Sequence, residues 1–293
     1  MRARIYLLLA LAVFISPLHA QSSHPDQPGK AAIATAHYLA TEAGHETLAI
    51  GGNAFDATVA VSAVLAVLEQ TSCGLGGGGF YMIHRAEDGF ETMIDARETA
   101  PALADRDMYL NPDGTANRDL SRSGPLAAGI PGQAAGLVHM AEKYGKLPLS
   151  VSLQPAIRIA RDGFPVYTKF LGMLDRSAKT MQRWPAAPEV FLPGGNIPEM
   201  GQVIKNPDLA RVLEKIAAEG RDAFYKGELA QILVDGVRDA GGIWSMEDLA
   251  NYEVKEREPV RTMYQGFELV TAPPPSSGGI ALAEILNIIE PYN

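Results

Sequence analysis

The chain has 293 residues, of which 47% are hydrophobic and 20% are charged, and its formal net charge at pH 7 is -9. This length and hydrophobic content are enough for a sizeable core in one domain or one large lobe. The basic residues are dispersed, so no basic stripe indicates nucleic-acid binding, and we interpret the acidity as favouring solubility.

The N-terminus has the order of features of a secretory signal peptide. Two arginines precede an apolar run at residues 5–15, and a small-residue cleavage site ends at Ala20. The apolar run is too short to span a bilayer, and no cysteine at the junction indicates a lipid anchor. We therefore expect a signal peptide at residues 1–20, a flexible mature N-terminus at residues 21–30, and an exported protein that is periplasmic or secreted, with no membrane anchor.

The cysteine and histidine content argues against disulfides and metal sites. Cys73 is the only cysteine, and the six histidines lack the close spacing of zinc ligands. Cys73 precedes a glycine loop and is a candidate thiol nucleophile, but no histidine lies near it in sequence. We interpret Cys73 as a core residue and expect neither a metal nor a cofactor.

The most informative stretch lies between Gly51 and Pro101. Asn53 is a helix N-cap residue, and the helix predicted at residues 54–69 is apolar nearly all round, as a buried helix is. Five glycines between residues 74 and 79 then allow sharp bends and close approach of the backbone.

A hairpin and a lone arginine follow this glycine loop. We predict strands at residues 80–85 and 90–95 joined by a turn at Asp88-Gly89. Arg97 comes just after the second strand, between Asp95 and Glu98. The order of these elements presents a single cation at the edge of a sheet.

The rest of the chain alternates helices with loops and ends on a second hairpin and a helix. Apolar residues on both faces of the strand at residues 80–85 predict a sheet that is covered on both faces, which indicates an α+β layered fold. We predict exposed loops at residues 105–124 and 185–201. The other predicted elements are helices at residues 31–43, 133–144, 152–162, 167–184, 207–219, 227–240, after Ser245 and at 280–289, and a hairpin at residues 260–264 and 267–271.

Six short motifs succeed one another along the chain. They are GGNAFDA at 51–57, GLGGGGF at 74–80, DARETAP at 95–101, GIPG at 129–132, NY at 251–252 and PPPSSGG at 273–279. In this order they resemble the large-subunit region of the γ-glutamyltranspeptidases, also called glutathione hydrolases. The resemblance runs from about residue 30 to the end.

The resemblance implies the four-layer αββα fold of N-terminal nucleophile hydrolases, here incomplete because only the large-subunit portion, residues 31–293, is present. It also implies that Arg97 binds the α-carboxylate of a γ-glutamyl group, a task for which the planar guanidinium is suited. The residues alone leave a second interpretation of Arg97, as a core arginine paired with Asp95 or Glu98. The implied partners are glutathione and other γ-glutamyl compounds, amino-acid or dipeptide acceptors, and the small subunit of the same precursor.

Two other features invite catalytic interpretations. Gly74, Gly76 and Gly79 form G-x-G-x-x-G, but a helix precedes this pattern and a strand follows it, the reverse of a dinucleotide-binding site. Ser276 and Ser277 follow three prolines without a nucleophile elbow, so we interpret them as structural.

The implied reaction is γ-glutamyl transfer and hydrolysis by an N-terminal threonine that autocleavage exposes. That threonine would lie beyond Asn293, so no catalytic residue is expected in this chain, which is expected to be inactive alone. The alternatives are a truncated non-catalytic remnant, a γ-glutamyl-binding lobe, or a related acylase that acts on β-lactam side chains.

Overall fold

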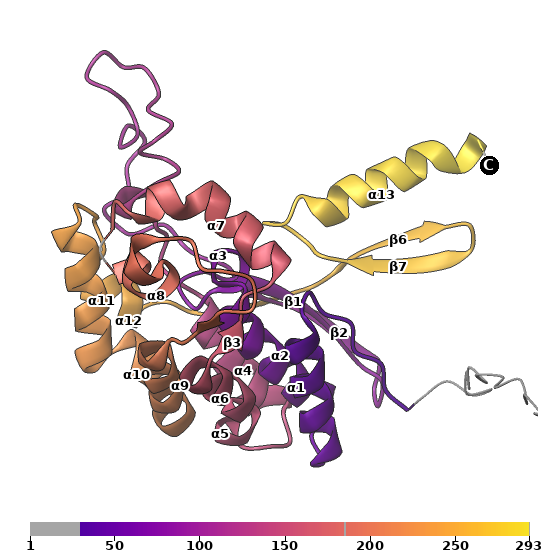
Figure 1. The fold of residues 1–293 in the computed structure, drawn as a ribbon. Coiled ribbons are helices and arrows are strands. Elements are labelled where there is room, and N and C mark those ends of the chain that lie inside the picture. The colour runs from indigo at the N-terminus through magenta and orange to yellow at the C-terminus, as the bar shows by residue number, and fades with distance from the viewer. Residues whose placement is uncertain (1–29, 185, 293) are drawn as a thin grey trace, which may run out of the picture. The chain divides into compact units, whose positions relative to one another are not determined.

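The computed structural model describes residues 30–184 and 186–292. The chain divides into two units, residues 1–32 and 33–293, and of the first unit only residues 30–32 are described, as exposed chain without helix or strand. The expected signal peptide at residues 1–20 and nearly all of the expected flexible segment at 21–30 lie outside the described residues. All helices and strands described below belong to the second unit (Figure 1).

A three-stranded antiparallel sheet lies at the centre of this unit. Its strand order is β1 (Gly79–Arg85), β2 (Phe90–Ala96) and β5 (Lys255–Arg257). The predicted first hairpin is confirmed, with Asp95 opposite Phe80 on β1 and opposite Lys255 on β5. Strand β5 was not predicted, because three residues of alternating charge carry no strand pattern of their own.

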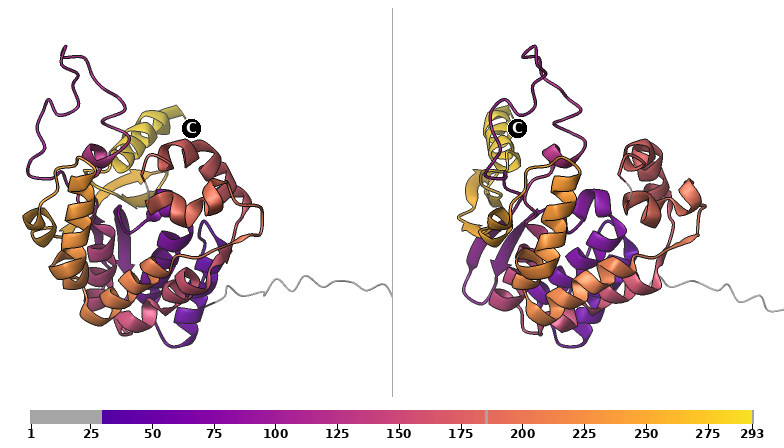
Figure 2. Two further views of the ribbon diagram at one scale, coloured as in Figure 1. Left: turned by 60° about the vertical axis from the view of Figure 1, so that its left-hand side comes forward. Right: turned by 90° about the vertical axis from the view of Figure 1, so that its left-hand side faces the viewer.

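Helices α2 (Ala54–Leu68) and α4 (Gln133–Tyr144) form the core next to this sheet. The Asn53 side chain accepts hydrogen bonds from the first turn of α2, and Asp56 bonds back to the Asn53 N–H, so the predicted N-cap is confirmed as a capping box. Figure 2 shows these helices gathered on one side of β1 and β2.

The prediction that the sheet is covered on both faces is confirmed on β2, where Met93 and Ile94 point to opposite faces and are both fully buried, but not on the edge strand β1. Ile83 of β1 is buried against the helices, whereas Met82, which points to the opposite face, is 40% exposed. An apolar residue on a strand therefore does not establish that described structure covers it.

Most of the remaining helices contribute to one hydrophobic cluster with α2 and α4, whereas the last helix contacts the second hairpin (Figure 1). The helices and 3₁₀ turns are α1 (Tyr38–Ala49), α3 (Gln70–Cys73), η1 (Pro125–Ala127), α5 (Leu149–Ser152), α6 (Gln154–Asp162), α7 (Thr168–Met181), α8 (Ala186–Phe191), η2 (Pro193–Gly195), α9 (Pro207–Glu219), α10 (Asp222–Tyr225), α11 (Gly227–Asp239), α12 (Met246–Ala250), α13 (Gly278–Ile289) and η3 (Glu290–Tyr292). The other strands are β3 (Phe164–Pro165), β4 (Val203–Ile204), β6 (Val260–Tyr264) and β7 (Phe267–Thr271).

The first helix differs from the prediction, which ended it at Gly44. Helix α1 instead starts at Tyr38, after the His37 ring accepts a hydrogen bond from Leu39, and continues past Gly44 to Ala49. A Cβ at Gly44 would lie 2.7 Å from Ile33 and 2.9 Å from Val61 of α2. Gly44 is therefore a close-packing residue between two helices and not a helix terminator.

Three other predictions need correction. The helix predicted at 152–162 is interrupted at Leu153, so α5 and α6 are separate. The segment predicted as a loop at 185–201 contains α8 and η2, since a proline is tolerated within the first turn of a helix. The two-residue strands β3 and β4 were missed because they are too short to show any alternation.

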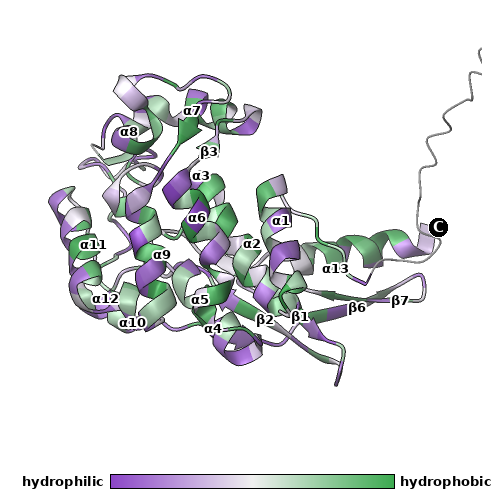
Figure 3. Ribbon diagram, turned by 60° about the horizontal axis from the view of Figure 1, so that its bottom comes forward, coloured by the Kyte–Doolittle hydropathy of each residue, from purple (hydrophilic) through white to green (hydrophobic). Residues whose placement is uncertain are grey.

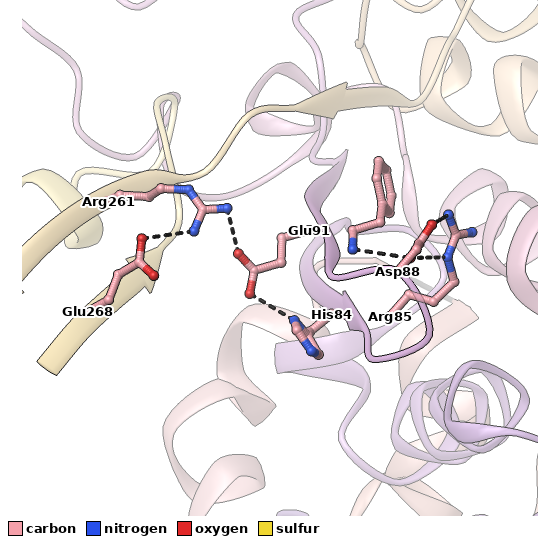
Figure 4. Close-up of polar contacts among 7 residues, drawn as sticks. His84, Arg85, Asp88, Glu91, Arg261 and Glu268 are labelled. Carbon is pink, nitrogen blue, oxygen red and sulfur yellow. Dashed lines mark hydrogen bonds and ion pairs between the residues drawn. The ribbon is translucent and has the colours of Figure 1, made fainter.

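The second predicted hairpin and the last helix are confirmed as β6, β7 and α13. Arg261 of β6 ties this hairpin to the central sheet through Glu91 of β2, which also accepts a hydrogen bond from His84 (Figure 4). Helix α13 is largely apolar (Figure 3), yet Ile285 and Ile288 are 55% and 67% exposed. Among the described helices, none is long and apolar enough to cross a membrane.

Candidate functional site

The glycine loop is held against the segment that carries Arg97. A Cβ at Gly78 would lie 2.4 Å from the Ala96 carbonyl oxygen and 2.8 Å from the Arg97 Cα, distances that only glycine permits. The Gly77 carbonyl in turn accepts hydrogen bonds from the N–H groups of Gly132 and Gln133 at 2.9 and 3.0 Å, at the start of α4. The loop therefore connects the end of β2 to the N-terminus of α4.

Two further contacts fix the backbone at Arg97. The Tyr252 hydroxyl donates a hydrogen bond of 2.9 Å to the Arg97 carbonyl oxygen, and the Arg97 N–H donates one of 3.1 Å to Asp95. Gly132 also lies against this segment, because a Cβ there would lie 2.1 Å from the Ala96 carbonyl oxygen. The backbone at residues 96–97 is thus enclosed by three elements that are distant in sequence.

The Arg97 side chain is exposed, and its guanidinium carbon lies 5.7 Å from the centre of the Phe80 ring. Within the described residues it makes no ion pair or side-chain hydrogen bond. Asp95 is 7% exposed and binds Arg257 Nε at 2.7 Å, so it is not the ion-pair partner of Arg97. Glu98 lies beside the glycine loop, near Gly77 and Gly129. The interpretation of Arg97 as a paired core arginine therefore does not describe this structure.

Arg97 borders two cavities. The larger has a volume of 470 Å³, and the smaller, on the side of Asp95 and Arg257, has a volume of 240 Å³. The larger cavity is lined by Gly76, Arg97, Glu98, Thr99, Ala100, Pro101, Ala104, Met108, Tyr109, Leu126, Ala127, Ala128 and Gly129. Arg97 is the one cationic side chain in that lining, which also contains the Glu98 carboxylate, so the arrangement offers an anion a single guanidinium as its binding partner.

Buried tyrosines support the site from beneath. Tyr81 of β1 donates a hydrogen bond of 2.9 Å to Gln133 of α4, and burial raises the pKa of Tyr81 to about 12. Tyr225 donates one of 2.8 Å to the Pro131 carbonyl and stacks on Tyr252, whose pKa burial also raises. These hydroxyls stay neutral at physiological pH, so they act as hydrogen-bond donors, Tyr81 to the Gln133 side chain and Tyr225 and Tyr252 to backbone carbonyls.

The other sequence candidates lie elsewhere. Ser276 accepts a hydrogen bond of 3.3 Å from Gly278 at the start of α13, and Ser277 is the N-cap of that helix without a side-chain bond. Cys73 is half-buried, and burial raises the pKa of its thiol, which disfavours the thiolate. In residues 30–184 and 186–292, no group of three or more His, Cys, Asp or Glu side chains is placed to hold a metal ion.

Two residues that shape this site, Tyr252 and Arg257, were not predicted to have a role in it. The sequence feature that could have indicated Tyr252 was its place in the NY motif, in order with the other motifs. Arg257 had no comparable signal, since nothing local relates it to Asp95.

Solved structures with the same fold identify the class. The chain superimposes on γ-glutamyltranspeptidase from Helicobacter pylori with a TM-score of 0.87 and 37% identity, over 91% of this chain and 77% of that one. Cephalosporin acylase from Bacillus halodurans gives a TM-score of 0.75 and 30% identity, over 95% of this chain and 53% of that one. The α+β fold that the chain shares with these neighbours is that of the N-terminal nucleophile hydrolases.

The sequence comparisons are more specific. The model of the gamma-glutamyltranspeptidase family matches residues 40–293, and the chain belongs to that family. It is 40% identical over 291 residues to the glutathione hydrolase proenzyme of Pseudomonas sp. (strain A14), a match that covers 99% of this chain and 50% of that protein. The chain spans about half the length of these curated relatives.

Proposed function

We propose that this protein hydrolyses glutathione and other γ-glutamyl compounds and transfers the γ-glutamyl group to amino-acid or dipeptide acceptors. The observation that carries the proposal is the Arg97 guanidinium, which borders the 470 Å³ cavity without an ion-pair partner among the described residues. A guanidinium donates two parallel hydrogen bonds to a carboxylate, and a γ-glutamyl group presents its α-carboxylate as such an acceptor. The glutathione hydrolase names of the relatives agree with this assignment.

The proposed nucleophile is an N-terminal threonine that autocleavage frees in a small-subunit region beyond Asn293. Its hydroxyl oxygen attacks the γ-carbonyl carbon while its own amine accepts the hydroxyl proton. The amide C–N bond then breaks, the leaving amine takes up that proton, and a γ-glutamyl ester remains. Water hydrolyses the ester or an acceptor amine attacks it, and the threonine hydroxyl is regenerated.

In this proposal the present chain supplies binding and not bond cleavage. Arg97 fixes the glutamyl end, which sets the distance from the γ-carbonyl to the nucleophile. Purified residues 21–293 should therefore release no glutamate from glutathione above background. Robust release by that preparation would contradict the assignment of the nucleophile to another segment.

A non-catalytic remnant or γ-glutamyl-binding lobe would also bind without cleaving. The coding sequence after Asn293 separates that alternative from the enzyme, because an open frame that reaches a threonine cleavage site favours the enzyme. The similarity to cephalosporin acylase supports a third candidate, an acylase that acts on β-lactam side chains. Parallel assays with glutathione and a cephalosporin would distinguish the two enzymes.

The test of the binding site is Arg97→Lys, which keeps the charge but removes the planar pair of donors. Hydrogen bonds to a charged partner contribute about 1.5–3 kcal/mol, so the Kd for glutathione, measured by calorimetry on residues 21–293, should rise roughly tenfold or more. The melting temperature should stay unchanged, because the Arg97 side chain has no ion-pair partner in the described structure.

Arg211→Lys is the matched control, since Arg211 lies on the exposed surface of α9 with Asp208 as its partner. This variant should bind glutathione with the affinity of the unaltered chain. If Arg97→Lys leaves the Kd unchanged, Arg97 does not bind the carboxylate. If it lowers the melting temperature and the yield without changing the Kd, the role of Arg97 is structural.

Export is part of the proposal and rests on the order of features at residues 1–20. Exported material should begin at Gln21 when its N-terminus is sequenced. A cytoplasmic mature protein that still starts at Met1 would exclude a cleaved signal peptide.

A further inference from the structure

The cavity beside Arg97 has two chemically different walls. One consists of the glycine loop and the segment that follows β2, and it carries the Arg97 guanidinium. The other is formed by Met108, Tyr109 and Leu126, which belong to the long connection between β2 and α4. The side chains of Met108 and Leu126 and the ring of Tyr109 bring apolar surface to this side of the cavity lining.

This connection is held at its base and along its stem. Thr99 and Ile130 form a two-hydrogen-bond bridge of 3.2 and 2.8 Å where it leaves and rejoins the body, and Asp248 accepts a hydrogen bond of 2.8 Å from the Ala102 N–H. The Tyr109 hydroxyl donates a hydrogen bond of 3.0 Å to the Leu126 carbonyl oxygen. This bond joins the segment that leaves the body of the protein to the segment that returns to it. The cavity-lining part is therefore positioned by the fold, whereas the rest continues as the long loop in Figure 1 and Figure 2.

Apart from the Tyr109 hydroxyl, the side chains of this wall are not explained by packing in the core. Met108, Tyr109 and Leu126 are half-buried, and in the part of the chain that the structure describes they belong neither to the hydrophobic core nor to the residues packed against it. Their shared environment is the 470 Å³ cavity, a volume within the roughly 300–1,000 Å³ range of ligand sites.

We propose that Met108, Tyr109 and Leu126 form an apolar subsite that selects ligands with an apolar or aromatic group attached to the part that Arg97 binds. This inference rests on the proposed function, and in its terms the preferred substrates are γ-glutamyl compounds whose group beyond the γ-amide is apolar. The carboxylate binds Arg97, and the apolar group displaces water from Met108, Tyr109 and Leu126, which is favourable because it removes apolar surface from solvent.

Calorimetry on residues 21–293 tests the subsite with two compounds that differ by one benzyl group, γ-glutamylglycine and γ-glutamylphenylalanine. The unaltered chain should bind the phenylalanine compound roughly tenfold more tightly, as expected for partial burial of one aromatic side chain. Met108→Ala should reduce that ratio severalfold while leaving the Kd for γ-glutamylglycine nearly unchanged.

Tyr109→Phe keeps the ring but removes the hydrogen bond to Leu126, so a smaller decrease in the ratio is expected. Leu103→Ala is the matched control, because Leu103 lies on the same connection, is 61% exposed and does not line the cavity. It should keep the ratio of the unaltered chain. Unchanged urea unfolding of the variants establishes that the fold is intact.

Different results would overturn the apolar subsite and the proposed function. If Arg97→Lys weakens both compounds but Met108→Ala and Tyr109→Phe leave their ratio unchanged, the subsite is wrong and the proposed function stands. If Arg97→Lys weakens neither compound, the proposed function is wrong. Equal affinities of the unaltered chain for the two compounds overturn the subsite, and the absence of measurable binding of either compound overturns both.

Discussion

Arg257 Nε donates a hydrogen bond of 2.7 Å to Asp95 Oδ2, although Arg97 is the arginine nearer to Asp95 in sequence. The other carboxylate oxygen of Asp95 accepts a hydrogen bond from the Arg97 N–H, at 3.1 Å. Asp95 therefore holds the backbone of Arg97 while Arg257 neutralises its charge. This division leaves the Arg97 guanidinium available at the cavity.

Replacing Arg257 by glutamine tests this division. Asp95 is buried and would lose its cationic partner, so we expect the free energy of unfolding to fall by about 1–3 kcal/mol. We also expect glutathione binding to weaken severalfold, because Asp95 becomes a competitor for Arg97. Urea unfolding and calorimetry measure the two effects, with Arg211→Gln as the surface control. Unchanged affinity in Arg257→Gln would show that Asp95 does not compete.

Replacing two helical glycines by alanine should change the free energy of unfolding in opposite directions. A Cβ at Gly136 of α4 would lie 2.6 Å from the Ala96 Cβ and 3.2 Å from the Tyr81 ring, so Gly136→Ala should destabilise by about 1–3 kcal/mol. A Cβ at Gly236 of α11 meets nothing within 4 Å, so Gly236→Ala should stabilise by about 0.5–1 kcal/mol through helix propensity. Urea midpoints report both, and a loss of stability in Gly236→Ala would contradict the argument.

Asp56 is a buried carboxylate whose partners are backbone N–H groups. It accepts hydrogen bonds from Asn53 at 2.8 Å, from Lys146 at 3.0 and 3.1 Å and from Leu147 at 3.2 Å, and so joins the start of α2 to the chain after α4. Asp56→Asn removes the charge that these donors stabilise and places a donor against them. We expect a loss of about 3 kcal/mol or more by urea unfolding.

Asp175→Asn is the control for the Asp56 substitution, because Asp175 is exposed on α7. It should change the unfolding free energy by no more than about 0.5 kcal/mol. If Asp56→Asn and Asp175→Asn had equal free energies of unfolding, the charge of Asp56 would have no structural role.

The Glu256 carboxylate should make stability depend on pH in the acid range. Burial raises its pKa, but hydrogen bonds from Lys143, His139 and Tyr144 outweigh burial and lower the pKa to about 2, below the ordinary 4.5. A depressed folded-state pKa stabilises the fold above pH 4.5, and this contribution is lost as the pH falls toward 2.

Glu256→Gln should therefore be less stable than the unaltered chain at pH 7, by about 1–2 kcal/mol because the carboxylate is partly exposed. The difference should narrow between pH 4.5 and pH 3. Melting curves of both proteins across this range make the comparison, and Glu219→Gln at the end of α9 serves as the control. A difference that does not depend on pH would exclude ionisation of Glu256 as its cause.

Local signals in the sequence predicted local structure well. Asn53 with Asp56, Ser245 with Asp248 and the glycines after α4 and α9 mark helix ends through bonds to near neighbours, and those ends are confirmed. Gly44 misled the prediction because its role is the approach of α1 to α2. Strand β5 was missed for a related reason, since its neighbour β2 lies far away in the chain.

The contacts of the candidate site between distant parts of the chain were likewise not predicted. The DARETAP motif singled out Arg97, but the bonds that position it join Tyr252 and Arg257 to residues 155 and 162 positions earlier. Those pairs depend on how the helices between them pack, which no periodicity in the sequence specifies. The apolar wall at Met108 and Tyr109 was likewise interpreted only as part of an exposed loop.

The enclosed backbone at residues 96–97 has a consequence for how this site can change. Gly78, Gly132 and the Tyr252 hydroxyl all contact main-chain atoms there, so the peptide is fixed whichever side chain residue 97 carries. The backbone at position 97 is therefore held in place, whereas its side chain is free to differ. Substitutions at this one residue can alter which chemical group is bound at the cavity without disturbing the fold. A Cβ added at Gly78 or Gly132 would instead collide with the Ala96 carbonyl oxygen and displace the backbone that holds residue 97.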